Sequence, residues 1–242
     1  MPHQGERSTA IRVDGLRLAL GDDPLPVLGG VDMVARAGQV TAIVGPSGCG
    51  KSTLLDVIAG ITPVQQGSVT FDGDARVALM PQRDALMPWR TLRDNVAAAA
   101  QVRGVGRREA RALADQEIER VGLTGFGSHY PHALSGGMRQ RGALARTLLA
   151  QTGVWLLDEP FGALDALTRA EMHRVLGAVR AQVPTTTVLV THDIAEAVAL
   201  AHVVLVASPA PMRITDAICV ADAGADAAAQ VLRALRAAGV PA

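Results

Sequence analysis

The most informative stretch of this chain is IVGPSGCGKSTLL, Ile43–Leu55. It fits the pattern G-x-x-x-x-G-K-[ST], whose fixed positions here are Gly45, Gly50, Lys51 and Ser52. An apolar run precedes the loop and a helix-forming run follows it, which is the context that a phosphate-binding loop requires. Glycines let successive backbone N–H groups converge on phosphate oxygens, and the start of a helix adds partial positive charge. The stretch therefore predicts a nucleotide phosphate site.

The residue types in this loop indicate separate roles. The Lys51 ammonium would reach the β- and γ-phosphates, and the Ser52 hydroxyl would bind Mg²⁺, which prefers oxygen ligands in octahedral geometry. The alternative is a glycine turn followed by a surface lysine. We expect the whole loop to bind nucleotide: Gly45, Pro46, Ser47, Gly48, Cys49, Gly50, Lys51, Ser52 and Thr53.

A second motif, VWLLDEP, spans Val154–Pro160. Four apolar residues predict a buried strand, and two carboxylates follow at its carboxyl end, where open α/β sheets bind ligands. Asp158 is placed to hold Mg²⁺, and Glu159 to orient or deprotonate the attacking water. The alternative is a pair of solvated acids in a turn.

Composition narrows the class of protein. A chain of 242 residues suits one large α/β domain, or one domain with an inserted subdomain. Lys plus Arg and Asp plus Glu both number 23, so no net charge is available to neutralise a nucleic acid. Cys49 lies in the glycine-rich loop, far in sequence from Cys219, which favours reduced thiols in a cytoplasmic setting. The chain has neither a signal-peptide core nor an apolar run that would span a membrane.

The order of predicted elements indicates an α/β fold with a P-loop NTPase core. Alternating residues over 11–20 and a second run over 27–35 predict an N-terminal antiparallel β subdomain. Further strands are expected at 39–45, 67–73, 76–80, 154–158, 186–192 and 202–207. Those that alternate with helices predict a mostly parallel sheet flanked by helices.

Helices are expected at 51–59, 96–102, 107–121, 138–150, 168–183, 194–200 and 225–239. The stretch of about 84–152 is mainly helical, and we interpret it as a helical subdomain inserted into the core that carries the phosphate-binding loop. The whole chain then forms a single domain.

A third motif, LSGGMRQR, spans Leu134–Arg141. Ser135 is a favourable N-cap, and Gly136 and Gly137 expose the backbone at the start of a helix. The motif predicts a second anion site, this time without a lysine.

Together these motifs resemble those of ABC-type ATPases. The chain has, in the family's order, GPSGCGKST, PQ with Gln82, LSGGMRQR, WLLDEP, GALD ending at Asp165, and THD with His192. The resemblance covers nearly the whole chain. It implies ATP hydrolysis with ATP and Mg²⁺ as cofactors, and a head-to-tail homodimer on ATP binding. In that dimer Ser135, Gly136 and Gly137 of one copy face the γ-phosphate held by the other.

The resemblance also implies roles for single residues. His192 would contact the γ-phosphate and hold Glu159 and water, and Asp165 would cross the dimer seam. Gln82 would sense Mg²⁺ and water and move the helical subdomain. Gln140 joins the nucleotide-binding residues, the catalytic set is Lys51, Gln82, Glu159 and His192, and the metal set is Ser52, Gln82 and Asp158. The alternatives are a polar loop residue for Gln82 and a surface or core residue for His192.

The chain departs from the family at the adenine site. The family usually stacks an aromatic residue on adenine, whereas this chain offers Leu20 or its neighbours and no aromatic before Phe71. We expect aliphatic contact alone, which leaves the preference for ATP over GTP open. Met80 stands where the family more often has an aromatic residue, and there we expect an effect on packing only.

The stretches ALMPWRTLRDNV and FGALDALTR resemble ATPases of bacterial importers of nitrate, sulfonate and taurine. Some relatives of that group carry pyrimidine precursors of thiamine. The resemblance implies membrane permease subunits that contact the chain near Trp89, and indirectly an extracytoplasmic solute-binding protein. The ATPase would then lie peripherally on the cytoplasmic face of the cell membrane. The alternative places Trp89 in the core of the helical insertion.

Two other function classes share part of this motif set. A soluble ABC-type ATPase of DNA repair, translation or cluster assembly is one, but the chain lacks the coiled-coil insertion of the first and the fused cassettes of the second. A P-loop kinase is the other, and it has no use for LSGGMRQR. Only 50 residues follow His192, too few for the regulatory β domain that some importers append.

Overall fold

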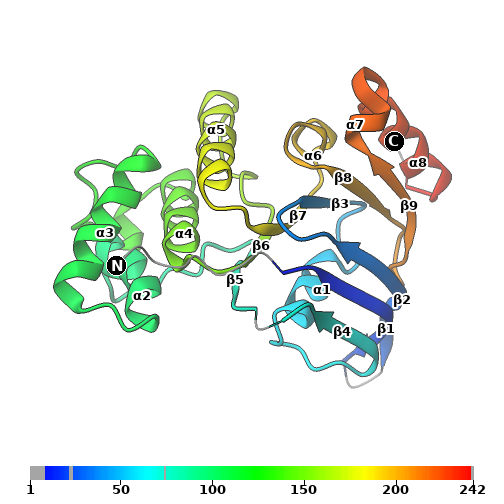
Figure 1. The fold of residues 1–242 in the computed structure, drawn as a ribbon, viewed down its shortest axis with the longest axis horizontal. Coiled ribbons are helices and arrows are strands. Elements are labelled where there is room, and N and C mark those ends of the chain that lie inside the picture. Colours follow the sequence, from blue (N-terminus) through cyan, green and yellow to red (C-terminus); the bar gives the residue numbers. More distant parts are fainter. Residues whose placement is uncertain (1–8, 22–23, 74, 241–242) are drawn as a thin grey trace. The chain divides into compact units, whose positions relative to one another are not determined.

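A computed structural model describes residues 9–21, 24–73 and 75–240. These residues form two compact units, which are described separately. The helical unit contains Met80–Thr152 and Pro160–Val183. The sheet unit contains the described parts of Arg7–Leu79 and Pro184–Ala242, together with Gly153–Glu159. Figure 1 shows the course of the chain through both. The turn expected between the first two strands includes residues 22 and 23, which lie outside the described residues.

The sheet unit begins with an antiparallel sheet in the order β2-β1-β4. Its strands are β1 (Ile11–Leu20), β2 (Leu25–Ala35) and β4 (Gln66–Phe71). The central strand places Ile11 opposite both Ala35 and Phe71. Apolar residues of β1 alternate with exposed ones, so one face of this sheet is buried. The predicted N-terminal antiparallel subdomain is confirmed.

The second sheet has the order β5-β6-β7-β3-β8-β9. Its strands are β3 (Val40–Val44), β5 (Val77–Met80), β6 (Val154–Asp158), β7 (Thr186–Thr191), β8 (Val203–Ala207) and β9 (Ile214–Cys219). β3 pairs in parallel with β7 and β8, and β6 pairs in parallel with β7. Every residue of β3, β6 and β7 is buried, as expected for strands covered on both faces. The predicted parallel core is confirmed.

The edge strand β9 is absent from the sequence prediction. It runs antiparallel to β8, and its residues, ITDAIC, are partly or fully exposed. Because an exposed edge strand has no buried apolar run, its sequence lacks the pattern that identified the other strands. Backbone pairing with β8 forms this strand.

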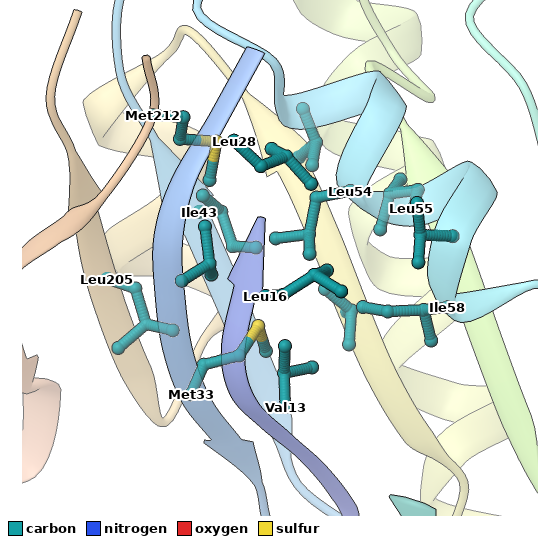
Figure 2. Close-up of a cluster of buried hydrophobic side chains, with 14 of the residues drawn as sticks. Val13, Leu16, Leu28, Met33, Ile43, Leu54, Leu55, Ile58, Leu205 and Met212 are labelled. Atoms are coloured by element: carbon teal, nitrogen blue, oxygen red, sulfur yellow. The ribbon is translucent and has the colours of Figure 1, made fainter. Parts of the chain in front are cut away.

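A shared hydrophobic core joins the two sheets of this unit. Figure 2 shows side chains of β1 and β2 meeting those of helix α1 (Lys51–Ile58), with Ile43 of β3 and Leu205 of β8 beside them. Leu54, Leu55 and Ile58 are the residues that α1 contributes. Since α1 is anchored by its apolar face, the loop that precedes it is held between β3 and the start of the helix.

The sheet unit ends in short helices beside β8 and β9. These are α6 (Ile194–Leu200), α7 (Val220–Ala223), a 3₁₀ turn at Gly224–Asp226 and α8 (Ala227–Ala237). α8 contacts α6, β8 and β9, and Figure 1 draws it in red at this end of the unit. The predicted closing helix is confirmed, although it begins two residues later.

The helical unit consists of four α-helices and a 3₁₀ turn in its described residues. They are α2 (Leu92–Val102), α3 (Arg107–Arg120), the 3₁₀ turn Pro131–Ala133, α4 (Gly136–Ala150) and α5 (Ala166–Gln182). α2 contacts both α3 and α4. The boundaries expected for the helical subdomain, about 84–152, remain a prediction. The compact unit also includes α5. No helix among the residues the structure describes has the length and apolar character to cross a membrane.

Candidate nucleotide-binding site

The glycine-rich loop depends on backbone conformations that only glycine adopts easily. Gly50 caps α1 with φ 118°, and Gly48 has φ 75°. A Cβ at Gly50 would also lie 3.0 Å from Val27 Cγ1 and 3.1 Å from Val27 O. Strand β2 therefore packs directly against the loop. A side chain at position 50 would clash with Val27 and displace the loop from β2.

Lys51 lies against the backbone of its own loop. Its Nζ donates to the carbonyl oxygens of Gly45 at 2.9 Å and Pro46 at 2.8 Å, and the residue is buried. Hydrogen bonds from an ammonium to neutral carbonyls are weaker than those to charged oxygens. The carbonyl oxygens of Gly45 and Pro46 thus hold the Lys51 ammonium close to the loop. Phosphate oxygens, which are charged, would replace these carbonyls as acceptors.

Asp158, the last residue of β6, meets Ser52 at the start of α1 through a side-chain hydrogen bond. Burial raises the pKa of the Asp158 carboxyl, against the lowering effect of the Ser52 hydrogen bond, and the neighbouring Glu159 raises it further. Among the described residues, no group bonds the buried Oδ1 of Asp158. A buried carboxylate oxygen without a donor is a costly arrangement that a cation would satisfy.

These two oxygen donors fit Mg²⁺. A hydroxyl beside a carboxylate with one unused lone pair is the donor chemistry that Mg²⁺ selects, and phosphates and water normally complete its shell. The described residues contain no group of three or more His, Cys, Asp and Glu side chains arranged to hold a metal ion. A metal ion here would therefore depend on the nucleotide for part of its coordination.

Glu159 has φ 47°, a left-handed conformation that is uncommon for a residue with a side chain. Such backbone strain typically costs about 1–3 kcal/mol and persists where neighbouring structure enforces it. Here the Glu159 N–H donates to Val190 O of the adjacent strand β7 at 2.9 Å. The backbone turn aims the carboxylate, and its Oε1 lies 3.2 Å from His192 Nδ1.

His192 lies in the turn between β7 and α6. The Asp193 N–H donates to Thr191 Oγ1 at 3.0 Å, and the Asp193 carboxylate caps α6 through the N–H groups of Ala195 and Glu196. These bonds order the turn on both sides of the imidazole, which is itself more than half exposed. An exposed imidazole on a rigid turn, beside a carboxylate, is arranged to contact a ligand.

The LSGG segment of the helical unit is tied to the loop that precedes α5. Ser135 Oγ caps α4 by accepting from Met138 N at 3.2 Å, and Gln140 Oε1 accepts from Ala163 N at 2.9 Å. A Cβ at Gly137 would lie 3.2 Å from Leu164 Cδ2, whereas a Cβ at the exposed Gly136 would meet only Arg139 Nη2, at an ordinary contact distance of 3.9 Å. The absence of a side chain thus allows close packing at Gly137 and leaves the backbone exposed at Gly136.

Asp165 acts as the N-cap of α5. Its carboxylate accepts from the N–H groups of Leu167 and Thr168 and from Thr168 Oγ1. Hydrogen bonds from Thr168 keep the pKa of Asp165 below its usual value. The predicted role at a dimer seam is untested, but the structure adds a role that sequence reasoning missed. Helix capping was readable from an Asp before a helix.

The predicted site residues therefore fall into two groups. In the sheet unit, the glycine-rich loop, Asp158, Glu159 and His192 converge at the carboxyl ends of β3, β6 and β7. The helical unit carries Gln82, which is exposed and lies two residues after β5, together with Ser135, Gly136, Gly137, Gln140 and Asp165.

Trp89 is 73% exposed, so the alternative that it fills the core of the helical insertion is wrong.

The buried side chain of Asn95, in α2, bonds the backbone of the loop that contains Trp89. Asn95 Oδ1 accepts from Met87 N at 2.7 Å, and Nδ2 donates to the carbonyls of Met87, Arg90 and Thr91 at 3.1, 3.1 and 3.0 Å. Sequence reasoning missed Asn95, because a single polar residue in a helix gives no pattern.

The side chains expected to contact the base are aliphatic. Leu20 and Leu25 face each other at the end of the β1–β2 hairpin and are 43% and 68% exposed. Leu25 lies two residues before Val27, which supports Gly50 of the phosphate-binding loop. Met80 is buried, in agreement with a role in packing.

Comparison with known proteins agrees with this geometry. Residues 28–162 match the family described as ABC transporter. The chain is 42% identical over 211 residues to the taurine import ATP-binding protein TauB of Chromobacterium violaceum, covering 85% of this chain and 81% of that protein. It is 41% identical over 197 residues to TauB of Escherichia coli, covering 79% and 77%.

The fold is similar to solved structures of the ATP-binding cassette MJ0796. A dimeric post-hydrolysis state bound to ADP and Pi superposes with a TM-score of 0.79 at 25% identity, covering 87% of this chain and 98% of that one. A second dimeric MJ0796 structure, of a bacterial ABC transporter cassette, gives 0.79 at 26% identity with the same coverage. The chain therefore belongs to the ABC transporter family. Within that family it is a nucleotide-binding ATPase subunit.

Proposed function

We propose that this chain hydrolyses ATP for an ABC importer and couples that hydrolysis to uptake of a small anion through separate permease subunits. Taurine or another sulfonate is the favoured solute, with nitrate as a related choice. The observation that carries this proposal is the identity of about two fifths to TauB proteins over roughly four fifths of both chains. Those proteins are named as taurine import ATP-binding proteins.

In this proposal the glycine-rich loop binds the phosphates of ATP. Lys51 exchanges the carbonyls of Gly45 and Pro46 for β- and γ-phosphate oxygens. Ser52 and the buried Oδ1 of Asp158 hold Mg²⁺, with Gln82 as a further ligand. The metal neutralises charge on the phosphates when bound.

Glu159 orients the attacking water or accepts its proton at the carboxylate, and the left-handed turn of its backbone aims that group. The imidazole of His192 positions the Glu159 carboxylate through the contact at 3.2 Å and touches the γ-phosphate. The geometry supports this assignment because a general base must be held within hydrogen-bond reach of its proton.

ATP binding joins two copies head to tail. Ser135, Gly136 and Gly137 of one copy approach the γ-phosphate held by the other, with Gln140 and Asp165 organising that surface. Two features support this arrangement: Gly136 is exposed, and Leu167, two residues after the Asp165 cap, is 85% exposed. A nucleotide with donors on both sides links two subunits only while it is present.

The loop around Trp89 is the proposed contact with the permease, which would hold this subunit at the cytoplasmic face of the membrane. Asn95 fixes the loop so that an aromatic side chain stays exposed, a feature typical of interface anchors. Next to it, Arg90 lines a cavity of about 370 Å³, which shares Arg107 with a second cavity of about 770 Å³. Of the arginines that line these cavities, Arg93 and Arg111 already pair with Asp115 and Asp94. The partner segment that fits this surface presents a pocket for Trp89 and carboxylates for Arg90 and Arg108.

Co-purification from detergent-solubilised membranes tests the proposal. A multi-span protein should co-purify with the tagged chain, and a periplasmic binding protein loaded with taurine should stimulate ATP hydrolysis in the reconstituted complex. A soluble partner without membrane spans would contradict the importer assignment. If only a binding protein loaded with a pyrimidine stimulates ATP hydrolysis, the transported solute is a thiamine precursor and not a sulfonate.

A further inference from the structure

A small cavity separates the C-terminal helix α8 from the His192 turn in the sheet unit. It has a volume of about 210 Å³ and is lined by Val44, Gly45, His192, Ile194, Leu232, Leu235, Arg236 and Val240. α8 and the residues after it form one wall of the cavity, and the end of β3 with the His192 turn forms the other. Figure 1 shows α8 beside α6 in this unit. None of the motifs identified in the sequence includes the residues that α8 contributes.

The lining is amphipathic. Most of the side chains are aliphatic, and the two polar ones are Arg236 and His192. No carboxylate lines the cavity, and no ion pair engages Arg236 in the part of the chain that the structure describes. Arg233, one turn earlier in α8, pairs instead with Asp226 at 2.8 Å and does not line the cavity. A guanidinium and an imidazole above an apolar wall suit an anion with an aliphatic body.

Size restricts the ligand further. Sites for drug-sized molecules have volumes of about 300–1,000 Å³, so a cavity of 210 Å³ holds a smaller molecule. A sulfonate or carboxylate with a short alkyl chain places its charge between Arg236 and His192 and its chain against Leu232, Leu235 and Val240.

The cavity shares a residue with the proposed catalytic pair. His192 lines the cavity and also contacts Glu159 Oε1 at 3.2 Å, and Gly45, which begins the phosphate-binding loop, lies beside it. An anion in the cavity would compete with the Glu159 carboxylate for the same imidazole. An anion bound in the cavity would therefore weaken the contact by which His192 positions Glu159, the proposed general base.

We propose that this cavity is a regulatory site for a short-chain organic anion, and that its occupancy slows ATP hydrolysis by drawing His192 away from Glu159. The predicted inhibition of ATP hydrolysis rests on the proposed roles of His192 and Glu159. Binding of the anion to the cavity is independent of those roles, so an experiment can reject inhibition and still support binding.

Calorimetry on the full-length chain without nucleotide tests binding, with 1-propanesulfonate as the probe. We expect saturable binding to one site that weakens at least about tenfold in Arg236→Gln and stays unchanged in Arg233→Gln, the matched control on the same helix. Leu232→Trp, which fills the cavity and keeps the charge, should also abolish binding. Absence of saturable binding would overturn the proposal, as would equal affinity in wild type and Arg236→Gln.

Two further probes define the ligand class. Propylammonium should not bind, because the site lacks a carboxylate, and inorganic sulfate should bind more weakly than propanesulfonate, because it lacks the apolar chain. Sulfate that binds as tightly as the sulfonate would contradict an amphipathic site.

Steady-state ATP hydrolysis tests the regulatory statement. Saturating propanesulfonate should lower kcat of the wild type at least about twofold with an unchanged KM for ATP, and Arg236→Gln should retain basal kcat and lose the inhibition. A raised KM at constant kcat would indicate competition at the nucleotide site and overturn the mechanism. Inhibition that persists in Arg236→Gln would do the same.

Discussion

The imidazole Nδ1 of His192 lies 3.2 Å from the carboxylate Oε1 of Glu159, although the two residues follow different strands. Parallel pairing of β6 with β7 places Asp158 opposite Val190, and the Glu159 N–H continues this pairing to Val190 O. The two side chains therefore leave the sheet at the same edge.

Glu159→Gln should lower ATP turnover by about 10²–10⁴-fold, the usual contribution of a general base. ATP binding should persist, since the amide keeps the shape of the side chain. Gel filtration with Mg-ATP should then show a stable dimer that dissociates when ATP is removed. Normal turnover in this variant would exclude Glu159 as the catalytic carboxylate.

Asp158→Asn should abolish hydrolysis and make the nucleotide-free protein more stable. Because burial raises the pKa of Asp158, the folded state binds its proton more tightly than the unfolded state does. Below the pKa that Asp158 has in the unfolded state, its protonated side chain costs the folded state nothing extra. As pH rises through the higher pKa of the folded state, the protein must bury a charged carboxylate, and folding stability falls. The neutral amide avoids this loss.

Thermal unfolding without Mg²⁺ or nucleotide checks that sign. At neutral pH the variant should melt about 2–4 °C above wild type, which corresponds to a gain of about 1 kcal/mol in a chain of this size. The difference should shrink as pH falls through the acid range, and Mg-ATP should stabilise wild type more than the variant. A lower melting temperature for the variant at neutral pH would contradict the role of burial.

Asn95→Ala should destabilise the helical unit by about 1–3 kcal/mol, because it removes the acceptor of the Met87 N–H and a donor to the Arg90 carbonyl, while the Met87 and Thr91 carbonyls keep backbone donors. Chemical denaturation would measure this change. Val102→Ala, at an exposed position of the same helix, is the control and should change the free energy of unfolding little. Equal stability of the two variants would show that water replaces the Asn95 network.

Trp89→Ala should weaken co-purification with the permease while basal ATP hydrolysis of the isolated subunit is unchanged. Tyr130→Ala removes another exposed aromatic side chain of the helical unit and should leave attachment intact. Removal of a central aromatic anchor typically costs about 2 kcal/mol or more, which is a loss of affinity of at least about 30-fold. Attachment of the Trp89→Ala protein at wild-type strength would rule this surface out.

Leu20→Tyr should tighten binding of Mg-ATP about tenfold or more, since stacking of a base on an aromatic ring contributes about 1–3 kcal/mol. Equilibrium binding of ATP and GTP to both proteins measures the gain and any change in base preference. Val34→Tyr, at an exposed position of β2, controls for the added ring. Affinities that do not move would mean that the base lies away from Leu20.

Much of the fold was predictable because its signals are local. The run of buried residues in β3 and β6, the glycines of the phosphate-binding loop and the apolar spacing of α1 each lie within a few neighbouring positions. Edge strand β9 lacked such a signal, because its pairing with β8 rather than a buried face defines it. The site residues were readable as motifs, but their roles remain predictions.

The phosphate-binding loop, the parallel core and the ordered motifs of an ABC-type ATPase could be predicted from the amino-acid sequence, because each is encoded in contiguous residues. Three other features became visible only in the folded chain: His192 lies 3.2 Å from Glu159, the Asn95 side chain bonds the backbone of the loop that carries the exposed Trp89, and Arg236 of α8 lines the same cavity as His192. Each of these features joins elements distant in sequence or depends on the fold around a loop, so packing rather than local pattern specifies it.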